Sequence, residues 1–366
     1  MADISQTNQD YLNNVLQKLH ATLEIKFKKF VDEQVRAIED TKVKIKKRKG
    51  VIHFMRIFPQ FAAAVENMLS SIAAAGGNSM DSPVSVNNLT VRRMIDREYD
   101  RIIKTMFDSL KVIARENPAV STLPATHGGG SSGLSFPGSG AASMISSVNI
   151  NLGSSLRGSS GADTEEDKEA LNFHILLIEN MNHFIEEVDN PKGLEVLDDW
   201  REAAHQELAE HLNLYLNTVM RRPLGKLLEY LENIEAQLAA GKNPGAVAAQ
   251  PSNAKSTFNK VLSGYDGKEV RKGIETLRKR VEKHFGGDDD APGGDGASVI
   301  TTGSTGSRVV GGGNRSLVMR VLKECERFYG EVEMRVGKIT TEVYGGEVLW
   351  EWPRAEVKSA FGHVGR

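Results

Sequence analysis

Apolar residues recur every three or four positions along most of this 366-residue sequence. Residues at that spacing line one face of an α-helix, so each series predicts a helix that buries one side. Alternation of apolar and polar residues, which is typical of a half-buried strand, is confined to EVLWEW at 347–352. The pattern therefore predicts an all-α fold. The helical series cover residues 12–38, 95–113, 197–219, 224–238 and 270–281.

The segment NFHILLIENMNHFIEEV at 172–188 differs from the other series because it is apolar on two sides. Leu171, Ile175 and Ile178 share one helical face, whereas Phe173 and Phe184 lie on another. A surface helix needs only one apolar stripe, so a helix with two is expected at the centre of a bundle.

Prolines mark the expected ends of helices. They occur in ENP at 116–118, DNPKG at 189–193 and RRPLG at 221–225. Because proline lacks an amide hydrogen and clashes with the preceding turn, a helix is expected to stop or restart at each of them. We expect about eight helices, mostly long and antiparallel, that stack as bundles into an elongated rod.

Two stretches do not follow the helical pattern. Residues 118–162 and 286–314 are rich in glycine and serine, and the first stretch carries almost no charge. They cannot bury enough apolar surface to offset their chain entropy, so both are expected to be disordered insertions. The predicted organisation is an N-terminal helical bundle at 1–117, a flexible linker at 118–162, and a C-terminal bundle at 163–366 that carries the insertion at 286–314.

Composition limits the class of protein. The net charge of −2 excludes a polycation that binds nucleic acid along its whole length, so any basic site is local. Cys325 is the single cysteine, which excludes an intrachain disulfide and suits a reducing compartment. The sequence contains no apolar run long enough to span a membrane and no signal peptide. It therefore indicates a soluble cytoplasmic protein.

Two formal motif matches fall within the first Gly/Ser-rich stretch. Gly128, Gly130 and Gly133 fit the dinucleotide-binding pattern G-x-G-x-x-G, and Gly129, Ser131 and Gly133 fit the nucleophile elbow G-x-S-x-G. Both motifs act on a tight turn between a strand and a helix. No strand is predicted before either match, so we interpret both as chance matches.

The remaining candidates for chemistry are isolated. Glu202 and His205 form one Glu-x-x-His pair, but a di-iron bundle needs two such pairs and two further glutamates. Cys325 has no recognisable catalytic partner and cannot by itself form a cysteine-based zinc site. The sequence therefore predicts no enzyme activity, no cofactor, no metal site and no small-molecule substrate.

A basic run at 42–49 is the one predicted contact site. It follows Glu39 and Asp40, and acids before bases along a helix are typical of an ordinary solvated surface. The run also suits an acidic protein partner or anionic lipid headgroups. It contains no aromatic residue that would stack on bases, so nucleic acid is not expected. Its cations are Lys42, Lys44, Lys46, Lys47, Arg48 and Lys49.

A second group of cations lies in KEVRKGIETLRKRVEKHF at 268–285. These residues flank the apolar series from Val270 to Val281, and the favoured interpretation is the solvated side of an amphipathic helix.

Three long blocks resemble one family in the same order. They are FVDEQVRAIEDTKVKIKKRKGVIHFMRIFPQFAAAVENML at 30–69, RRPLGKLLEYLENIEAQLAAGK at 221–242 and FNKVLSGYDGKEVRKGIETLRKRVEKHF at 258–285. The sequence is similar in these blocks to the C-terminal region of the Sec-three family of exocyst subunits, also called exocyst complex component one. The resemblance extends from about Leu12 to Phe285 and is weaker beyond Arg315.

The resemblance implies a rod of stacked helical bundles without catalytic residues. It implies partners among the other exocyst subunits and a role in tethering secretory vesicles at the plasma membrane during exocytosis, with the chain peripheral to that membrane. The family's lipid- and GTPase-binding module lies in an N-terminal domain that these blocks do not match. An alternative function is a peripheral module that binds anionic membranes through residues 42–49.

Overall fold

The structure, a computed structural model, describes residues 3–41, 50–75, 83–115, 165–189, 194–286, 312–348 and 350–362. Within these ranges all regular structure is helical, which confirms the all-α prediction. The alternation in EVLWEW forms no strand in the part of that segment that the structure describes. The α-helices are α1 (Asp3–Glu39), α2 (His53–Ala75), α3 (Pro83–Arg115), α4 (Glu165–Asp189), α5 (Asp198–Ala239), α6 (Pro244–Ala248), α7 (Lys255–Leu262), α8 (Gly267–Phe285), α9 (Gly312–Glu342) and α10 (Arg354–Gly362).

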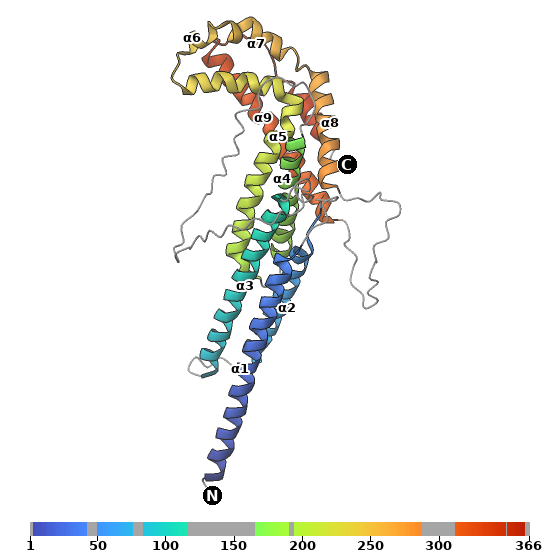
Figure 1. Ribbon diagram of the computed structural model, residues 1–366. Helices are drawn as coiled ribbons and strands as arrows, with labels where there is room; N and C mark the ends of the chain where they lie inside the picture. The colour runs from blue at the N-terminus through green and yellow to red at the C-terminus, as the bar shows by residue number, and fades with distance from the viewer. Residues whose placement is uncertain are drawn as a thin grey trace, which may run out of the picture.

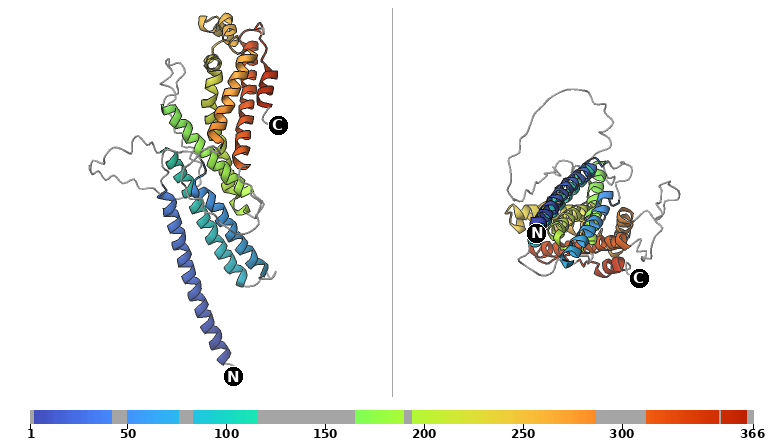
Figure 2. Two further views of the ribbon diagram at one scale, coloured as in Figure 1. Left: turned by 90° about the vertical axis from the view of Figure 1, so that its right-hand side faces the viewer. Right: turned by 90° about the horizontal axis from the view of Figure 1, so that it is seen from below.

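The helices form an elongated molecule (Figure 1). Helices α1, α2 and α3 lie together at one end, and α6 to α9 with the second half of α5 lie at the other. Helix α4 and the first half of α5 pack closely together between the two ends, as Figure 2 also shows. The N-terminal half of α1 projects beyond the neighbouring helices in both figures.

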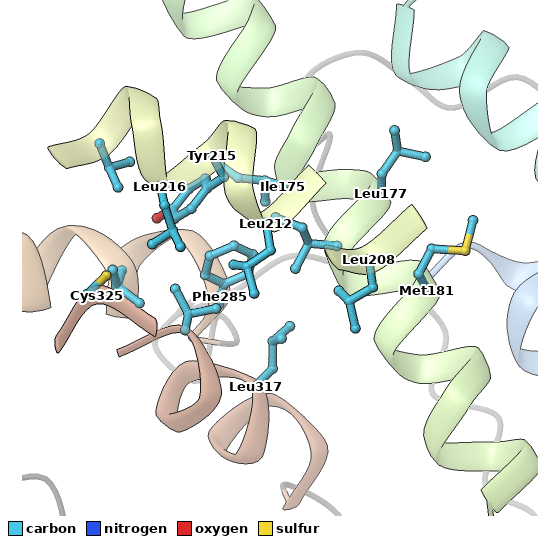
Figure 3. Packing of buried hydrophobic residues seen from close by; sticks show 14 of the residues in the cluster. Ile175, Leu177, Met181, Leu208, Leu212, Tyr215, Leu216, Phe285, Leu317 and Cys325 are labelled. Atoms are coloured by element: carbon cyan, nitrogen blue, oxygen red, sulfur yellow. The ribbon is translucent and has the colours of Figure 1, made fainter. Parts of the chain in front are cut away.

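Helix α4 is the central helix, as its two apolar faces predict. It contacts α2 and α3 toward one end, α8 and α9 toward the other, and α5 along its length. Ile175, Leu177 and Met181 are buried; Figure 3 shows Ile175 on the side of α4 that faces Leu212 of α5, whereas Leu177 and Met181 extend from α4 in other directions. Each neighbouring helix thus covers a different side of α4, which explains why the segment is apolar all round.

Polar side chains of α4 hold the chain that enters α2. The Gly50 amide donates to a Glu179 carboxylate oxygen at 2.7 Å, and the Ile52 amide donates to Asn180 Oδ1 at 2.8 Å. Asn180 Nδ2 donates in return to the carbonyls of Gly50 and Leu176. Gly50 has a φ of 94°, a conformation that favours glycine. Buried polar groups thus fix the point at which the backbone reaches α2.

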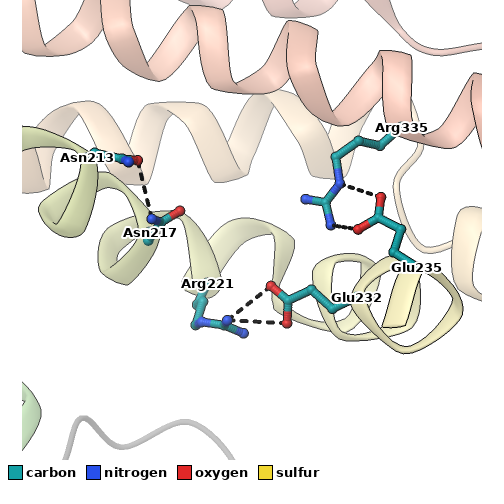
Figure 4. A network of polar contacts seen from close by, with 6 residues as sticks. All are labelled: Asn213, Asn217, Arg221, Glu232, Glu235 and Arg335. Carbon is teal, nitrogen blue, oxygen red and sulfur yellow. Dashed lines mark hydrogen bonds and ion pairs between the residues drawn. The ribbon is translucent and has the colours of Figure 1, made fainter. Parts of the chain in front are cut away.

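Helix α5 passes through Pro223 without ending, so the prediction of a stop or restart at 221–225 is wrong. The proline bends the helix, and the Leu227 amide one turn later donates to the hydroxyl oxygen of Tyr265 at 3.1 Å. Arg221 and Glu232 would lie about 16 Å apart along a straight helix. In the bent helix Arg221 Nη2 lies 3.0 Å from Glu232 Oε1 (Figure 4).

The second half of α5 is fastened to α9. Arg335 donates two hydrogen bonds to the Glu235 carboxylate, at 2.8 and 2.6 Å (Figure 4). Planar pairing of a guanidinium with a carboxylate fixes orientation as well as distance. Phe258 of α7 stacks between Tyr230 and Tyr344, with ring centroids 5.2 and 5.1 Å apart. These contacts hold the direction that α5 takes after the bend.

The two predicted insertions lie almost wholly outside the described residues. This applies to all of 118–162 and to 287–311. At the edges of the second stretch, Gly286 follows the end of α8, whereas residues 312–314 already belong to α9. The stretch is therefore three residues shorter at its C-terminal side than the predicted 286–314. The predicted division at 117 and 163 stays a prediction.

A chain of polar groups crosses the interface of α3, α4 and α5. Lys111 of α3 pairs with Glu207 of α5, and Glu207 Oε2 lies 3.4 Å from His211 Nε2. His211 Nδ1 lies 3.2 Å from Nδ1 of His174 on α4, and both histidines are buried. Hydrogen bonding to His211 and then to Lys111 lowers the pKa of Glu207 to about 2. Burial, followed by repulsion from His211, lowers the pKa of His174 to about 4.

We expect His174 to make the protein less stable as the pH falls from 6.5 toward 4. In that range the unfolded chain binds a proton at this residue that the folded chain does not, so stability rises with pH. Between pH 7 and pH 5 the loss attributable to His174 is about 2 kcal/mol. The Glu207 contribution is lost at lower pH, as its carboxylate protonates between about 4 and 2.

The test is urea denaturation of wild-type protein and His174→Gln at pH 7 and pH 5. The difference in unfolding free energy between the two pH values should be smaller in the variant by about 2 kcal/mol. A residual difference is expected because burial also lowers the pKa of His183. His53→Gln, at an exposed position, is the control. An unchanged pH dependence in His174→Gln would contradict the assignment.

We also expect that neither Gly/Ser-rich stretch is needed for folding, because the entropy of loop closure changes only slowly with length. Replacing 118–162 or 287–311 by a short Gly/Ser linker should preserve helicity by circular dichroism and the cooperative melting transition. Limited proteolysis should cut first within these stretches. Loss of the transition, or first cuts within 222–240 or 268–285, would show that the helical boundaries are misplaced.

Candidate interaction surfaces

The predicted basic contact site lies outside the described residues. The structure places none of Lys42, Lys44, Lys46, Lys47, Arg48 and Lys49. The residues on both sides of the run are described. Helix α1 ends at Glu39, and the Thr41 hydroxyl donates to the Ala37 carbonyl. On the other side Gly50 is bound to Glu179 and Asn180 of α4. The run therefore connects two well-defined points, and its contact role stays a prediction.

Helix α1 is covered by other helices only in its C-terminal half. There Val31, Val35 and Ile38 are buried, and Asp32 pairs with Arg101 of α3 at 2.6 Å. In the projecting half the leucines of the same apolar series remain in solvent. The C-terminal part of the apolar series therefore belongs to the core of this chain, whereas its N-terminal part forms an exposed surface.

The exposed leucines form what we call the α1 stripe. These leucines are between 53% and 64% exposed. Single exposed leucines are common on protein surfaces, but an aligned row of them is unusual. Their spacing of four, three and four residues is a heptad pattern, which packs against a second helix. The stripe consists of Leu12, Leu16, Leu19 and Leu23.

Charges of both signs lie around the α1 stripe. Lys18 and Lys26 lie within it or just beyond it, and Asp10 and Glu24 lie at its two ends. Lys28 pairs with Glu24 at 2.8 Å. An amphipathic helix with an apolar row of its own would match the stripe.

A second surface is a groove between α5, α7 and α8, which we call the cationic groove. Its volume is about 570 Å³, within the range of small-molecule sites. Pro223 and Gly273 meet at its wall, where a Cβ on Gly273 would lie 3.2 Å from the proline Cβ. Five cationic side chains line it, and Glu269 is the one acidic residue among the described lining residues. The cations are Arg222, Lys226, Lys260, Lys272 and Arg280.

The candidates for catalysis are not brought together. Glu202 is exposed and His205 is partly exposed on α5, and neither has a metal-binding neighbour within the described ranges. The acid and histidine that do interact on this helix are Glu207 and His211, at a spacing of four residues. Burial raises the pKa of the Cys325 thiol to about 12, so this residue is a buried core side chain rather than a nucleophile (Figure 3).

The glycine motifs at 128–133 lie outside the described residues. Across the described helices, none combines the length and the low charge that a membrane span requires.

Comparison with known proteins identifies the family. The family model described as "Exocyst complex component Sec3, C-terminal" matches residues 1–346. Exocyst complex component 1 of Mus musculus is 22% identical over 275 residues, which cover 75% of this chain and 23% of that protein. Exocyst complex component 1 of Drosophila melanogaster is 33% identical over 89 residues, which cover 24% of this chain and 10% of that protein.

The chain therefore spans less than a quarter of the length of the curated relatives it matches. No solved structure matches it. Because the family model covers nearly all of the sequence, including every described helix except α10, this chain belongs to the Sec3 C-terminal family of exocyst components.

Proposed function

We propose that this chain is a non-catalytic structural part of the exocyst that helps to tether secretory vesicles to the plasma membrane. Its family is one of exocyst components, and this supports assembly with the other subunits. The observation that carries the proposal is the α1 stripe, an apolar row on a helix that projects from the molecule (Figure 1). A monomer would gain nothing from keeping this surface in water.

The partner that fits the α1 stripe is an amphipathic helix of another exocyst subunit. Heptad leucines pack into the spaces between side chains of a facing helix, so a single helix can cover the whole row. Covering four leucines would contribute several kcal/mol, at about 2 kcal/mol for each side chain that is fully buried. Acidic residues beside the partner's apolar row would face Lys18 and Lys26, whereas Lys28 and Lys29 already pair with Glu24 and Glu33.

The alternative function is peripheral binding to anionic membranes through residues 42–49. Cations near a charged bilayer contribute about 1 kcal/mol each, so six of them would be sufficient for reversible attachment. The described residues favour the subunit proposal, because the exposed apolar row on α1 suits contact with another helix better than contact with a lipid headgroup.

Assembly is expected to depend on the α1 stripe. We expect Leu16→Glu/Leu19→Glu to reduce capture of the other exocyst subunits in pull-down and size-exclusion experiments by about tenfold or more, because two charges would be buried without partners. Both leucines are exposed, so the variant should melt like the wild-type chain. Gln17→Glu/Ala21→Glu adds the same charge to the opposite face and should assemble normally. Equal capture by all three proteins would exclude the stripe as the assembly surface.

The membrane alternative is tested by liposome flotation. Changing all six cations of the 42–49 run to glutamine should abolish binding to phosphatidylserine vesicles if the run is the anchor, and rising salt should weaken binding by the wild-type chain. Binding that persists in the variant, or that does not respond to salt, would contradict the alternative. The variant should retain subunit capture, since the α1 stripe is unchanged.

A further inference from the structure

The cationic groove concentrates positive charge from three separate helices. Arg222 and Lys226 come from α5, Lys260 from α7, and Lys272 and Arg280 from α8. The whole chain carries a net charge of −2, so this local excess is not a consequence of composition. A concave surface lined mainly by one sign of charge focuses the electrostatic potential and raises the local concentration of counter-ions. The groove is therefore suited to an anionic ligand.

The groove lies at the bend in α5. Gly273 lets α5 and α8 approach closely there, because a side chain at this position would press against the ring of Pro223. Thr257 and Val261 of α7 line the groove beside this contact. The walls are held by Tyr265, whose hydroxyl oxygen accepts the Leu227 amide. The cavity is thus built by the fold and does not depend on the positions of long surface side chains alone.

The arrangement of the cations indicates several anionic groups on one compact ligand. Lys272 and Arg280 are eight residues apart on α8, which corresponds to about 12 Å along the helix. A single phosphate contacts only groups within about 3 Å of its oxygens, so one phosphate cannot engage both ends of the groove. Because the cations come from three helices that line one groove of about 570 Å³ rather than from a single helix face, an extended polyanion is a poorer fit.

The lining of the groove is poorly suited to binding a nucleobase. Tyr265 is the one aromatic residue among the described lining residues, and its hydroxyl is already bound to the backbone of α5. Burial raises the pKa of Tyr265, so the phenol stays protonated at neutral pH and can donate to an anionic oxygen. Stacking on a base is thus less suited to the site than contact with phosphate groups.

We propose that the cationic groove between α5, α7 and α8 binds a compact ligand that carries several phosphate groups, of the inositol polyphosphate type. The same chemistry is offered by a soluble inositol phosphate and by the headgroup of a phosphoinositide lipid. This site is separate from the predicted run at 42–49 and from the α1 stripe. The proposal of phosphate binding can therefore be tested independently of the proposed role in assembly.

The first test is calorimetric titration of the full chain with inositol hexakisphosphate at physiological ionic strength. One molecule should bind per chain, and Lys226→Gln/Lys272→Gln should weaken binding about tenfold or more. Both lysines are exposed, so this variant should fold normally. The matched control is Lys268→Gln/Lys279→Gln, which removes the same charge from parts of α8 that do not line the groove, and its affinity should change less than about twofold.

Glu269 provides a variant with the opposite expected sign. Its carboxylate lies among the groove residues and repels an anion, so Glu269→Gln should tighten binding about two- to fivefold. Misfolding or a loss of helix stability would not increase affinity. An affinity that is unchanged or weaker in Glu269→Gln would contradict binding of the phosphates at this position.

The source of the phosphate groups is distinguished by flotation with vesicles that contain phosphatidylinositol bisphosphate. Binding to these vesicles that is lost in Lys226→Gln/Lys272→Gln identifies a lipid headgroup, and binding of inositol hexakisphosphate alone identifies a soluble ligand. Absence of both, or equal loss of affinity in the two lysine double variants, would overturn the proposal. The same holds if the groove variant loses capture of exocyst subunits without any phosphate binding, since the groove would then be a protein contact.

Discussion

The packing of α4 against α5 is the interaction on which the rest of the structure depends. Ile175, Leu176 and Leu177 of α4 are almost completely buried, and so are Leu208 and Tyr215 of α5. Helices from both ends of the molecule pack on this pair, so the pair connects the helices of one end with those of the other. Truncation of one such side chain to alanine typically costs 2–5 kcal/mol. No other pair of described helices touches both ends so extensively.

Buried polar groups make this packing specific. A helix that is apolar all round can rotate between neighbours without a large loss of contact, so apolar area alone does not define its orientation. Asn180 removes this freedom, because its side chain pairs with backbone groups of Ile52 and Gly50 that no rotated α4 would meet. The pair of His174 with His211 does the same at the interface with α5. Each pairing is local, but together they favour a single orientation of α4 among its neighbours.

The features that could be predicted from the sequence are those that depend on local periodicity. The helices and the central place of α4 follow from the spacing of apolar residues. The course of α5 through Pro223 could not be predicted, because the contact that accommodates the bend comes from Tyr265, nearly forty residues later. For the same reason the sequence does not distinguish the leucines of α1 from core residues, because only the tertiary packing shows that α3 covers just part of that helix.

The candidate sites divide in the same way. The basic run at 42–49 is evident as consecutive letters, whereas the cationic groove is assembled from α5, α7 and α8 and has no contiguous signature. The sequence predicts a solvated helix face at 268–285. Lys268, Arg271 and Lys279 fit this prediction, because they are exposed and do not line the groove, whereas Lys272 and Arg280 line it and Arg278 donates to the Ala360 carbonyl. The sequence does not predict the interaction of Glu207 with His211, because acids and histidines four residues apart are common on polar helix surfaces. The pair is recognised as a buried polar cluster only because Lys111 and His174 contact it from other helices.

The bend in α5 has a mechanical consequence. One unbroken helix runs from the middle of the molecule, where it packs against α4, into the end formed by α6 to α9, so a load on that end passes to the middle through its backbone rather than through a loop. Arg221 and Glu232 would be about 16 Å apart along the axis of a straight helix, so the ion pair between their side chains at 3.0 Å spans the inside of the bend. Because both side chains are partly in solvent, salt weakens that ion pair. Salt therefore loosens this one contact, whereas the ring of Pro223 and the contacts of α5 with α7 and α9 keep the bend in place.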